Sequence, residues 1–332
     1  MEDYAFLEME DGSLTLGLGP FREQAHAPSS GTAFYCNRFG LDDPCPWKVP
    51  TEVLRVARLP ADFGSGKTPS VAWESPSPDP FERVFASIQR EIASGHALKL
   101  VPVVTQKGVV EAGRARDLGQ PAAEAASGLW SYAYSVGDAG FAGATPERFI
   151  RVEDNEVQTM ALAGTAVAGS EKRFEADPKE IREHELVAGF LAERLARFGA
   201  TARGERGLLE LGAITHFMTP LRLRLEGDFD ITSLIAALHP TPAVGHLPHD
   251  ATLLSRLHMI RAELGCPAVF GAPFGLWDDG LFHSVVAIRG LFWKGQQVLL
   301  PSGCGVIEQS RFEAEWEELR LKREAVRTFF GI

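Results

Sequence analysis

The chain has 332 residues, of which 45% are hydrophobic and 23% are charged, the composition of a soluble globular protein that can bury a large core. Its length allows one large domain or two ordinary ones. The formal net charge of −11 argues against a general nucleic-acid binder, because phosphate contacts require clustered Lys and Arg. A local cationic pocket for a small anion remains compatible with this charge.

The cysteines and the N-terminal residues indicate the cellular compartment. The four cysteines show no CxxC spacing, so neither a disulfide framework nor a structural zinc site is expected. The first residues, Met-Glu-Asp-Tyr, lack the basic-then-apolar pattern of a signal peptide. No apolar run reaches the roughly 18 residues of a membrane span. We therefore expect a cytoplasmic protein with free thiols.

Residues 1–80 are rich in turns between short strands and contain no recognisable chemistry. A helix is predicted over about 80–94, because apolar residues recur there on one stripe. The next predicted strand, 98–104, contains Lys99 within an apolar run. Burying this amine is costly unless it is paired or neutral, and burial could lower its pKa enough to make it a base. An edge strand with Lys99 facing water, which Pro102 favours, is an equal alternative.

A hairpin-like region is predicted next, formed by residues 129–134, 140–152 and 156–164. Glu147 directly follows Thr-Pro in a Gly-rich turn, at the start of Arg148-Phe-Ile-Arg. Most glutamates in such turns are solvated. If Glu147 lies in a pocket instead, burial raises the pKa of its carboxyl and makes it a candidate general acid.

A helix is predicted after Asp177, which can cap its N-terminus with Pro178 at the first helical position. The expected buried stripe consists of Ile181, Leu186, Val187, Phe190, Leu191 and Leu195. Glu180 and Glu183 are three residues apart and therefore share one face of this helix.

Further elements predicted along the chain are a strand over 215–225, helices over 231–238 and 253–264, and strands over 268–277 and 281–289. The strand over 215–225 carries His216, and a single His is more often structural than catalytic. Arg289 ends an apolar run, so either a bound carboxylate or an internal salt bridge would explain it. Strands separated by helices, without a series of βαβ units, predict an α+β fold with no clean split into two domains.

The C-terminal segment repeats the acidic spacing seen after Asp177. A Gly-rich turn at Gly303-Cys-Gly305 leads into a helix on which Glu315 and Glu318 are three residues apart, with Lys322 one turn further. A solvated amphipathic helix is the ordinary interpretation of such a charged run. Two acidic pairs that face each other would instead form an oxygen-rich site for a hard cation such as Mg²⁺.

Together these segments resemble the chorismate-utilising enzymes, a family that includes isochorismate, salicylate, anthranilate and aminodeoxychorismate synthases. The segments that carry the resemblance are Lys99 in its strand, Gly143-Ala-Thr-Pro-Glu147, Ala163-Gly-Thr165, Lys179-Glu-Ile-Arg-Glu-His184, His216-Phe-Met-Thr219, His239-Pro-Thr-Pro-Ala-Val-Gly245, Ala287-Ile-Arg289 and the motif from Gly303 to Lys322. The resemblance implies a single chorismate-binding domain over 1–332, with antiparallel sheets enclosing and flanked by helices. Residues 80–330 carry the family motifs, and 1–80 form a shortened N-terminal part.

The resemblance also implies an activity. Family members that use ammonia are similar in carrying Thr where this chain has Ala243, whereas isochorismate synthases carry Ala. The implied reaction is the Mg²⁺-dependent isomerisation of chorismate to isochorismate, in which water attacks C2 and the C4 hydroxyl leaves. The implied protein is a cytoplasmic monomer without a fused amidotransferase, serving menaquinone, siderophore or salicylate biosynthesis.

The resemblance further implies roles for individual residues. Lys99 would act as the base, Glu147 as the protonated acid, and His216 would position water or substrate. The implied metal-binding residues are Glu183 and Glu318, with Glu180 and Glu315 nearby through water. The implied substrate-binding residues are Gly164, Thr165, Ala243, Arg289, Gly303, Gly305 and Lys322.

Three positions depart from the family pattern. Val104 stands where the family often has Arg, Ala166 stands where a basic residue is usual, and His246 stands where a second Gly is expected. These departures keep three alternatives open: a salicylate synthase, an aminating enzyme served by a partner amidotransferase, and a non-catalytic protein that binds chorismate.

Overall fold

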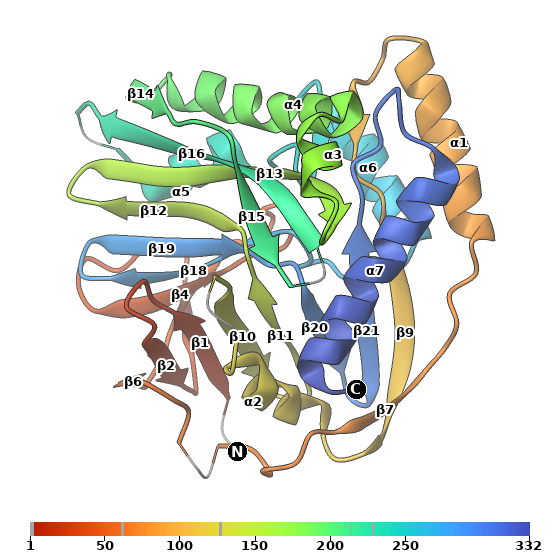
Figure 1. The fold of residues 1–332 in the computed structure, drawn as a ribbon. Coiled ribbons are helices and arrows are strands. Elements are labelled where there is room, and N and C mark those ends of the chain that lie inside the picture. The colour runs from red at the N-terminus through yellow and green to blue at the C-terminus, as the bar shows by residue number, and fades with distance from the viewer. Residues whose placement is uncertain (1–2, 61–62, 126–127, 213, 228) are drawn as a thin grey trace.

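The computed structural model describes residues 3–60, 63–125, 128–212, 214–227 and 229–332, and two antiparallel sheets dominate it (Figure 1). The first sheet has nine strands in the order β6-β2-β1-β10-β11-β20-β21-β9-β7. Their bounds, in that order, are Glu52–Val56, Leu14–Leu18, Tyr4–Glu8, Trp130–Val136, Ala139–Thr145, Gly290–Lys294, Gln297–Gly303, Val103–Ala112 and Ser70–Trp73.

The second sheet has the strand order β14-β16-β13-β12-β19-β18-β4-β5-β3, and β15 also pairs with β16. The bounds of β14 to β3, in sheet order, are Gly199–Arg203, Ile214–Leu225, Glu156–Val167, Arg148–Glu153, Leu281–Val286, Pro273–Asp278, Thr32–Cys36, Trp47–Val49 and Arg22–Gln24, and β15 spans Gly207–Leu211. A separate two-stranded ladder joins β8 (Lys99–Leu100) to β17 (His246–Leu247).

Seven α-helices lie in the described part of the chain: α1 (Asp79–Ala93), α2 (Gly119–Ala122), α3 (Glu171–Glu175), α4 (Pro178–Leu195), α5 (Ile231–Leu238), α6 (Ala251–Glu263) and α7 (Phe312–Phe330). Figure 1 shows α4 running along the second sheet beside β13 and β16, while α7 crosses in front of β21 of the first sheet. Among the described residues, none of these helices combines the length and apolarity that crossing a bilayer requires.

The two sheets pack against each other through a cluster of aromatic side chains. Phe34 and Phe274 come from the second sheet, and Tyr132 and Phe141 come from the first. The ring of Phe274 lies at the centre, 5.3 Å from Phe141 and 6.0 Å from Tyr132 between centroids. These distances are typical of favourable aromatic pairs, so the cluster fixes how one sheet sits on the other.

The chain passes from one sheet to the other at points that the sequence prediction did not contain. The turn predicted at Thr145-Pro-Glu147 is confirmed, and β12 of the second sheet begins after it at Arg148, while β11 before it belongs to the first sheet. The exposed position expected for Glu147 at this strand start is wrong, because its side chain is buried. The strand predicted over 98–104 is split into β8 and β9. Pro102 lies at that break, where a residue without an N–H cannot continue a ladder.

Another crossing between the two sheets joins β19 of the second sheet to β20 of the first and contains Arg289, whose φ of 56° lies in the left-handed region. The side chains of Glu147 and Arg289 therefore both stand where the chain changes sheets. Glu147 is buried there and Arg289 is half-buried, although both residues adjoin apolar strands.

The helices agree more closely with the prediction than these strands. The helix predicted over 231–238 is α5 with the same bounds, and α1 and α4 begin and end within about two residues of expectation. Asp177 caps α4, accepting hydrogen bonds from the backbone N–H groups of Lys179 and Glu180. The predicted buried stripe of α4 is wrong in part, because Ile181 and Leu186 are only half-buried while Glu183 and His184 are buried.

Candidate active site

A cavity with about 700 Å³ of space free of protein atoms, including its solvent-open part, lies where the crossing segments meet α4 and α7. Most of the residues predicted to act together line it: Glu147, Gly164, Thr165, Glu183, His216, Ala243, Arg289, Gly303, Gly305, Glu318 and Lys322. The remaining wall is mainly apolar and includes Val101, Leu162, Phe270 and Ile288. Apolar walls with a few convergent polar groups are typical of sites for small molecules.

Three of the predicted site residues do not line this cavity: Lys99, Glu180 and Glu315. The Lys99 side chain is 0% exposed, and its Nζ lies 3.0 Å from Glu183 Oε1. The alternative of an edge strand that exposes Lys99 to water is therefore wrong. Glu180 and Glu315 line an adjoining cavity, which also reaches Thr165 and Glu318.

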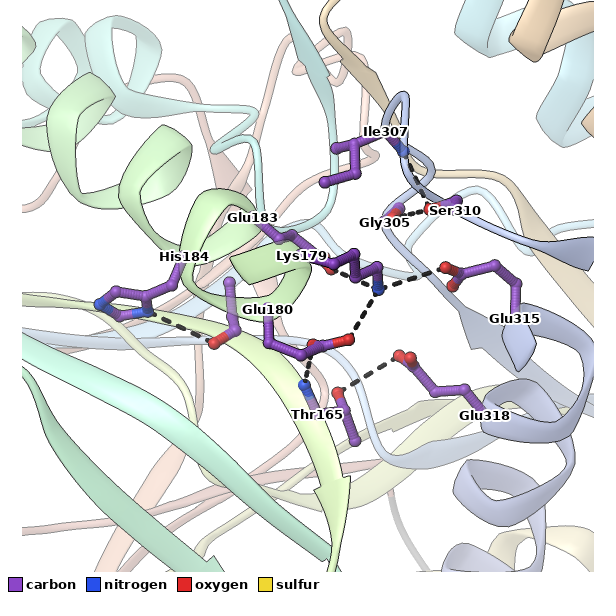
Figure 2. Close-up of polar contacts among 12 residues, drawn as sticks. Thr165, Lys179, Glu180, Glu183, His184, Gly305, Ile307, Ser310, Glu315 and Glu318 are labelled. Carbon is purple, nitrogen blue, oxygen red and sulfur yellow. Dashed lines mark hydrogen bonds and ion pairs between the residues drawn. The ribbon is translucent and has the colours of Figure 1, made fainter. Parts of the chain in front are cut away.

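The two acidic pairs face each other across the gap between α4 and α7 (Figure 2). Lys179 joins them, because its Nζ lies 3.0 Å from Glu180 Oε1, 3.1 Å from Glu183 Oε2 and 3.2 Å from Glu315 Oε1. The face of α7 that carries Glu315 is therefore not solvated, and Glu315 itself is 1% exposed, although other charged side chains of the helix are exposed.

Thr165 connects the same two helices from the end of β13. Its backbone N–H donates to Glu180 Oε2 at 2.8 Å, and its hydroxyl donates to Glu318 Oε1 at 3.3 Å. Lys322 Nζ lies 2.6 Å from the same Glu318 oxygen and donates to the Gly303 carbonyl at 2.9 Å. Four carboxylates and three ammonium groups are therefore packed into one buried cluster.

Burial and direct contacts set the pKa of each carboxyl in this cluster. Burial raises the pKa of Glu180 and of Glu315 above the ordinary range, and in both the nearby Lys179 only partly offsets this effect. Burial also raises the pKa of Glu183, but its contacts with Lys99 and Lys179 outweigh burial and hold the pKa below the ordinary value.

Glu147 lies in the same cavity without such contacts. Burial raises the pKa of its carboxyl to about 8, although the charges of Lys99, Lys322 and Arg289 act in the opposite direction. Within the described residues its carboxyl forms no ion pair. The group is therefore largely protonated at neutral pH, the state that a general acid requires.

His216 and Arg289 form a hydrogen-bonded pair across the cavity wall. Arg289 Nη2 lies 2.9 Å from His216 Nε2, and since Arg has no acceptor, Nε2 must carry the lone pair. His216 Nδ1 then donates to the Gly164 carbonyl at 2.8 Å. Burial and the adjacent Arg289 lower the pKa of His216 to about 3, so the ring is neutral and fixes the arginine.

Gly305 allows the closest approach in the site. A Cβ at this position would lie 2.0 Å from Glu183 Oε1 and 2.6 Å from Lys99 Cε. Any larger residue would therefore displace the Lys99–Glu183 pair. Gly164 is required for a second reason, since its φ of 77° places Thr165 N against Glu180.

The donor chemistry of the acidic cluster fits Mg²⁺, which prefers carboxylate oxygens. Glu315 Oε2 is buried and accepts no hydrogen bond, so one oxygen of the cluster still lacks a partner. Over the described ranges of the chain, however, no three acidic, His or Cys side chains converge closely enough to hold an ion. The ammonium of Lys179 lies between the carboxylates instead.

Lys179 is the residue whose part in the site was missed from the sequence. It belongs to the motif Lys179-Glu-Ile-Arg-Glu-His184, and a lysine four residues before Glu183 indicates an i,i+4 pair. That spacing usually describes a solvated helix surface. Only the opposite helix, with Glu315, turns it into a buried contact.

The three departures from the family pattern lie outside the cavity lining. Val104 is buried in β9, and Ala166 lines the adjoining cavity with Glu180 and Glu315. His246 is fully buried opposite Leu100, with Nδ1 2.9 Å from the Pro248 carbonyl. None of the three departures therefore lines the cavity that contains Glu147 and Arg289.

A family model described as chorismate binding enzyme matches residues 61–331. The chain belongs to this family. It is similar to a salicylate biosynthesis isochorismate synthase from Pseudomonas aeruginosa, with 34% identity over 209 residues that cover 59% of this chain and 43% of that protein. It is also similar to isochorismate synthase MenF from Bacillus subtilis, with 29% identity over 218 residues, or 60% and 45% of the two chains.

The regions that match this chain make up less than half the length of these two curated relatives. The solved structure of MenF, the menaquinone-specific isochorismate synthase from Escherichia coli, matches over 99% of this chain and 88% of that one, with a TM-score of 0.80 and 19% identity. This similarity confirms the predicted α+β fold of the chorismate-binding, anthranilate and isochorismate synthase type.

Proposed function

We propose that this member of the chorismate-binding enzyme family converts chorismate into isochorismate, by adding water at C2 and releasing the C4 hydroxyl as water. The observation that carries the proposal is the state of Glu147. Its carboxyl is buried, has a pKa of about 8, and lies in one cavity with Arg289 and Lys322. A proton donor placed among cations suits a substrate that is a dianion and loses a hydroxyl.

The cations in the cavity would bind the two carboxylates of chorismate. Arg289 is held by neutral His216, so its remaining N–H groups are directed before the substrate arrives. A planar guanidinium favours bidentate contact with a carboxylate. Lys322, at Gly303, would add a second positive charge to the enolpyruvyl carboxylate.

A divalent ion, Mg²⁺ by its preference for hard oxygen ligands, would be held by Glu183 and Glu318, with Glu180 and Glu315 reached through water. When bound, it would neutralise the ring carboxylate and stabilise negative charge during the reaction. The proposal thereby assigns the acidic cluster to the metal and the Glu147 side of the cavity to proton transfer.

The protons would move between two side chains of this chain. In this proposal Lys99 first releases to solvent the proton that it holds while paired with Glu183, and it then takes a proton from the water whose oxygen bonds to C2. Glu147 gives its proton to the C4 oxygen as the C4–O bond breaks and the ring double bonds shift. One water enters and one leaves, so the composition of the substrate is unchanged. Lys99 and Glu147 return to their starting states by exchanging protons with solvent.

Ala243 supports water as the nucleophile. It lines the cavity and offers only a methyl group, where family members that use ammonia resemble one another in carrying a hydroxyl. Nothing in the cavity specifically favours an aminating reaction, and we expect turnover without a partner amidotransferase.

The test is incubation of purified protein with chorismate and Mg²⁺, with the products separated by chromatography. We expect isochorismate, and we expect its formation to stop in EDTA and resume when Mg²⁺ is restored. Unchanged chorismate would overturn the proposal. Salicylate with pyruvate would reassign the chain as a salicylate synthase, and an aminated product in added ammonium would reassign it as an aminating enzyme.

Two variants separate catalysis from binding in the same assay. Lys99→Ala and Glu147→Gln should each abolish turnover while chorismate still binds. A non-catalytic chorismate-binding protein would instead bind chorismate without turnover in the wild type, and neither variant would change its behaviour.

A further inference from the structure

Lys179 occupies the centre of the acidic cluster, as Figure 2 shows. It contacts three carboxylates at 3.0 to 3.2 Å, two on its own helix α4 and one on α7. The other two ammonium groups stand at the edge of the cluster, Lys99 against Glu183 and Lys322 against Glu318. In the described part of the chain, Lys179 is the only lysine whose ion pairs reach both helices.

The ammonium of Lys179 is held firmly in its charged form. Three carboxylates contact its Nζ directly, those of Glu180, Glu183 and Glu315, and such a surplus of negative charge favours the ammonium form. A permanent positive charge thus neutralises part of the repulsion between the two acidic pairs. A divalent cation bound by the same carboxylates would do the same, so the two cations cannot both hold the central position.

The adjoining cavity gives the Lys179 side chain room to move. This cavity has about 930 Å³ of space free of protein atoms, including its solvent-open part, and its lining includes Lys179, Glu180, Glu315 and Glu318. Glu183 and Glu318 also face the cavity assigned to substrate. The acidic cluster therefore lies between two cavities, and Lys179 can leave its centre without entering the substrate cavity.

We propose that Lys179 is an internal counter-ion that stabilises the metal-free acidic cluster, competes with the divalent cation for its centre, and is displaced into the adjoining cavity when the metal binds. The inference rests on the metal site of the proposed function. It explains why the carboxylates gather although no three of them, among the described residues, converge on one point.

The first experiment measures Mg²⁺ binding by calorimetry without chorismate, in the wild type and in Lys179→Met. Removing the competing charge should tighten Mg²⁺ binding by at least about tenfold. The same variant should melt at a lower temperature than the wild type in EDTA and show a larger increase in melting temperature when Mg²⁺ is added. Lys172→Met, on the exposed surface of α3, is the matched control and should change neither measurement.

The result that would overturn the inference is Mg²⁺ binding by Lys179→Met that is equal to or weaker than that of the wild type. Absence of Mg²⁺ binding in both proteins would overturn it as well. The proposed function fails differently, through a chromatogram without isochorismate, and tighter Mg²⁺ binding by Lys179→Met would still support the counter-ion.

A second measurement uses the wild type and keeps the inference testable if the variant does not fold. Brief labelling with an amine-reactive ester, followed by mass spectrometry, reports how accessible each lysine is. Displacement predicts that Mg²⁺ increases labelling of Lys179 several-fold while labelling of Lys172 stays constant. Labelling of Lys179 that Mg²⁺ leaves unchanged or reduces would contradict displacement.

Discussion

Glu147 and Glu183 line the same cavity, and both are buried, yet their carboxyl groups behave in opposite ways. Burial raises the pKa of Glu147 to about 8, whereas the pKa of Glu183 is held below its ordinary value. Glu183 contacts two ammonium groups at 3.0 and 3.1 Å, while the cations near Glu147 act without contact. Burial raises a carboxyl pKa and cations lower it, so at these two residues direct ion pairs, and not the number of nearby charges, decide whether the pKa rises or falls.

The two carboxyl groups therefore contribute to stability with opposite dependence on pH. At Glu183 the folded pKa is lowered, so its contribution is present above the unfolded pKa and is lost as pH falls through the folded pKa. At Glu147 the folded pKa is raised, so the folded state keeps a proton that the unfolded state releases. Its contribution is fully present below the unfolded pKa of about 4.3 and is lost as pH rises toward 8.

The largest effect is expected from Glu183→Gln, which leaves Lys99 buried without its carboxylate. Removing one partner of a buried ion pair typically destabilises a protein by about 3–5 kcal/mol. We expect a loss of this size in the free energy of unfolding, measured with denaturant at pH 7 in EDTA. Glu193→Gln, on the exposed surface of the same helix, is the control and should change stability by less than about 0.5 kcal/mol. A loss no larger than that of the control would show that the Lys99–Glu183 pair is not a strong contact.

Glu147→Gln should have the opposite effect on stability, although it also lowers activity. An amide cannot ionise, so the variant avoids the buried charge and should be more stable than the wild type by roughly 1–3 kcal/mol at pH 8. Turnover of chorismate should fall by about 10²–10⁴. The stability difference should disappear below pH 4, where the wild-type carboxyl is protonated in both folded and unfolded states. A variant less stable than the wild type at pH 8 would contradict the assigned protonation of Glu147.

The pH dependence of kcat/KM tests the protonation of Glu147 in the wild-type protein. Because the acid must carry its proton, kcat/KM should decline as pH rises through about 8, by about tenfold per pH unit above it. His216, whose pKa is about 3, should produce no change in rate between pH 5 and 8. A profile that is flat from pH 7 to 10 would exclude Glu147 as the acid.

The sequence predicts those parts of the molecule that depend on local signals. Asp230 caps α5, and apolar spacing defines its length, so its predicted bounds agree with the structure. The pairing of acidic residues three apart on two helices likewise follows from helical geometry. The contacts of Lys179 with Glu183 on α4 and Glu315 on α7 confirm that the two acidic pairs face each other.

Features that depend on distant partners could not be predicted in the same way. Nothing near Pro146 indicates that the chain changes sheets there, because on one side β11 pairs with β20 and β12 with β19, strands more than a hundred residues away. The left-handed backbone conformation of Arg289 could not be predicted from the sequence either, since this conformation normally favours glycine. An i,i+4 spacing such as that of Lys179 and Glu183 usually describes a surface pair, whereas here the contact of Lys179 with Glu315 of α7 encloses it.

The smallest effect is expected at His216, which touches Arg289 and contributes no charge of its own. His216→Asn retains an amide near the Nδ1 position but removes the acceptor for Arg289, whereas His216→Gln can place an oxygen near the Nε2 position. Loss of a hydrogen bond to a charged group corresponds to about a tenfold change. We therefore expect His216→Asn to raise KM for chorismate about tenfold with a smaller change in kcat, and His216→Gln to raise it less. If both variants instead lowered kcat equally and left KM unchanged, His216 would act on the reacting atoms and not through the arginine.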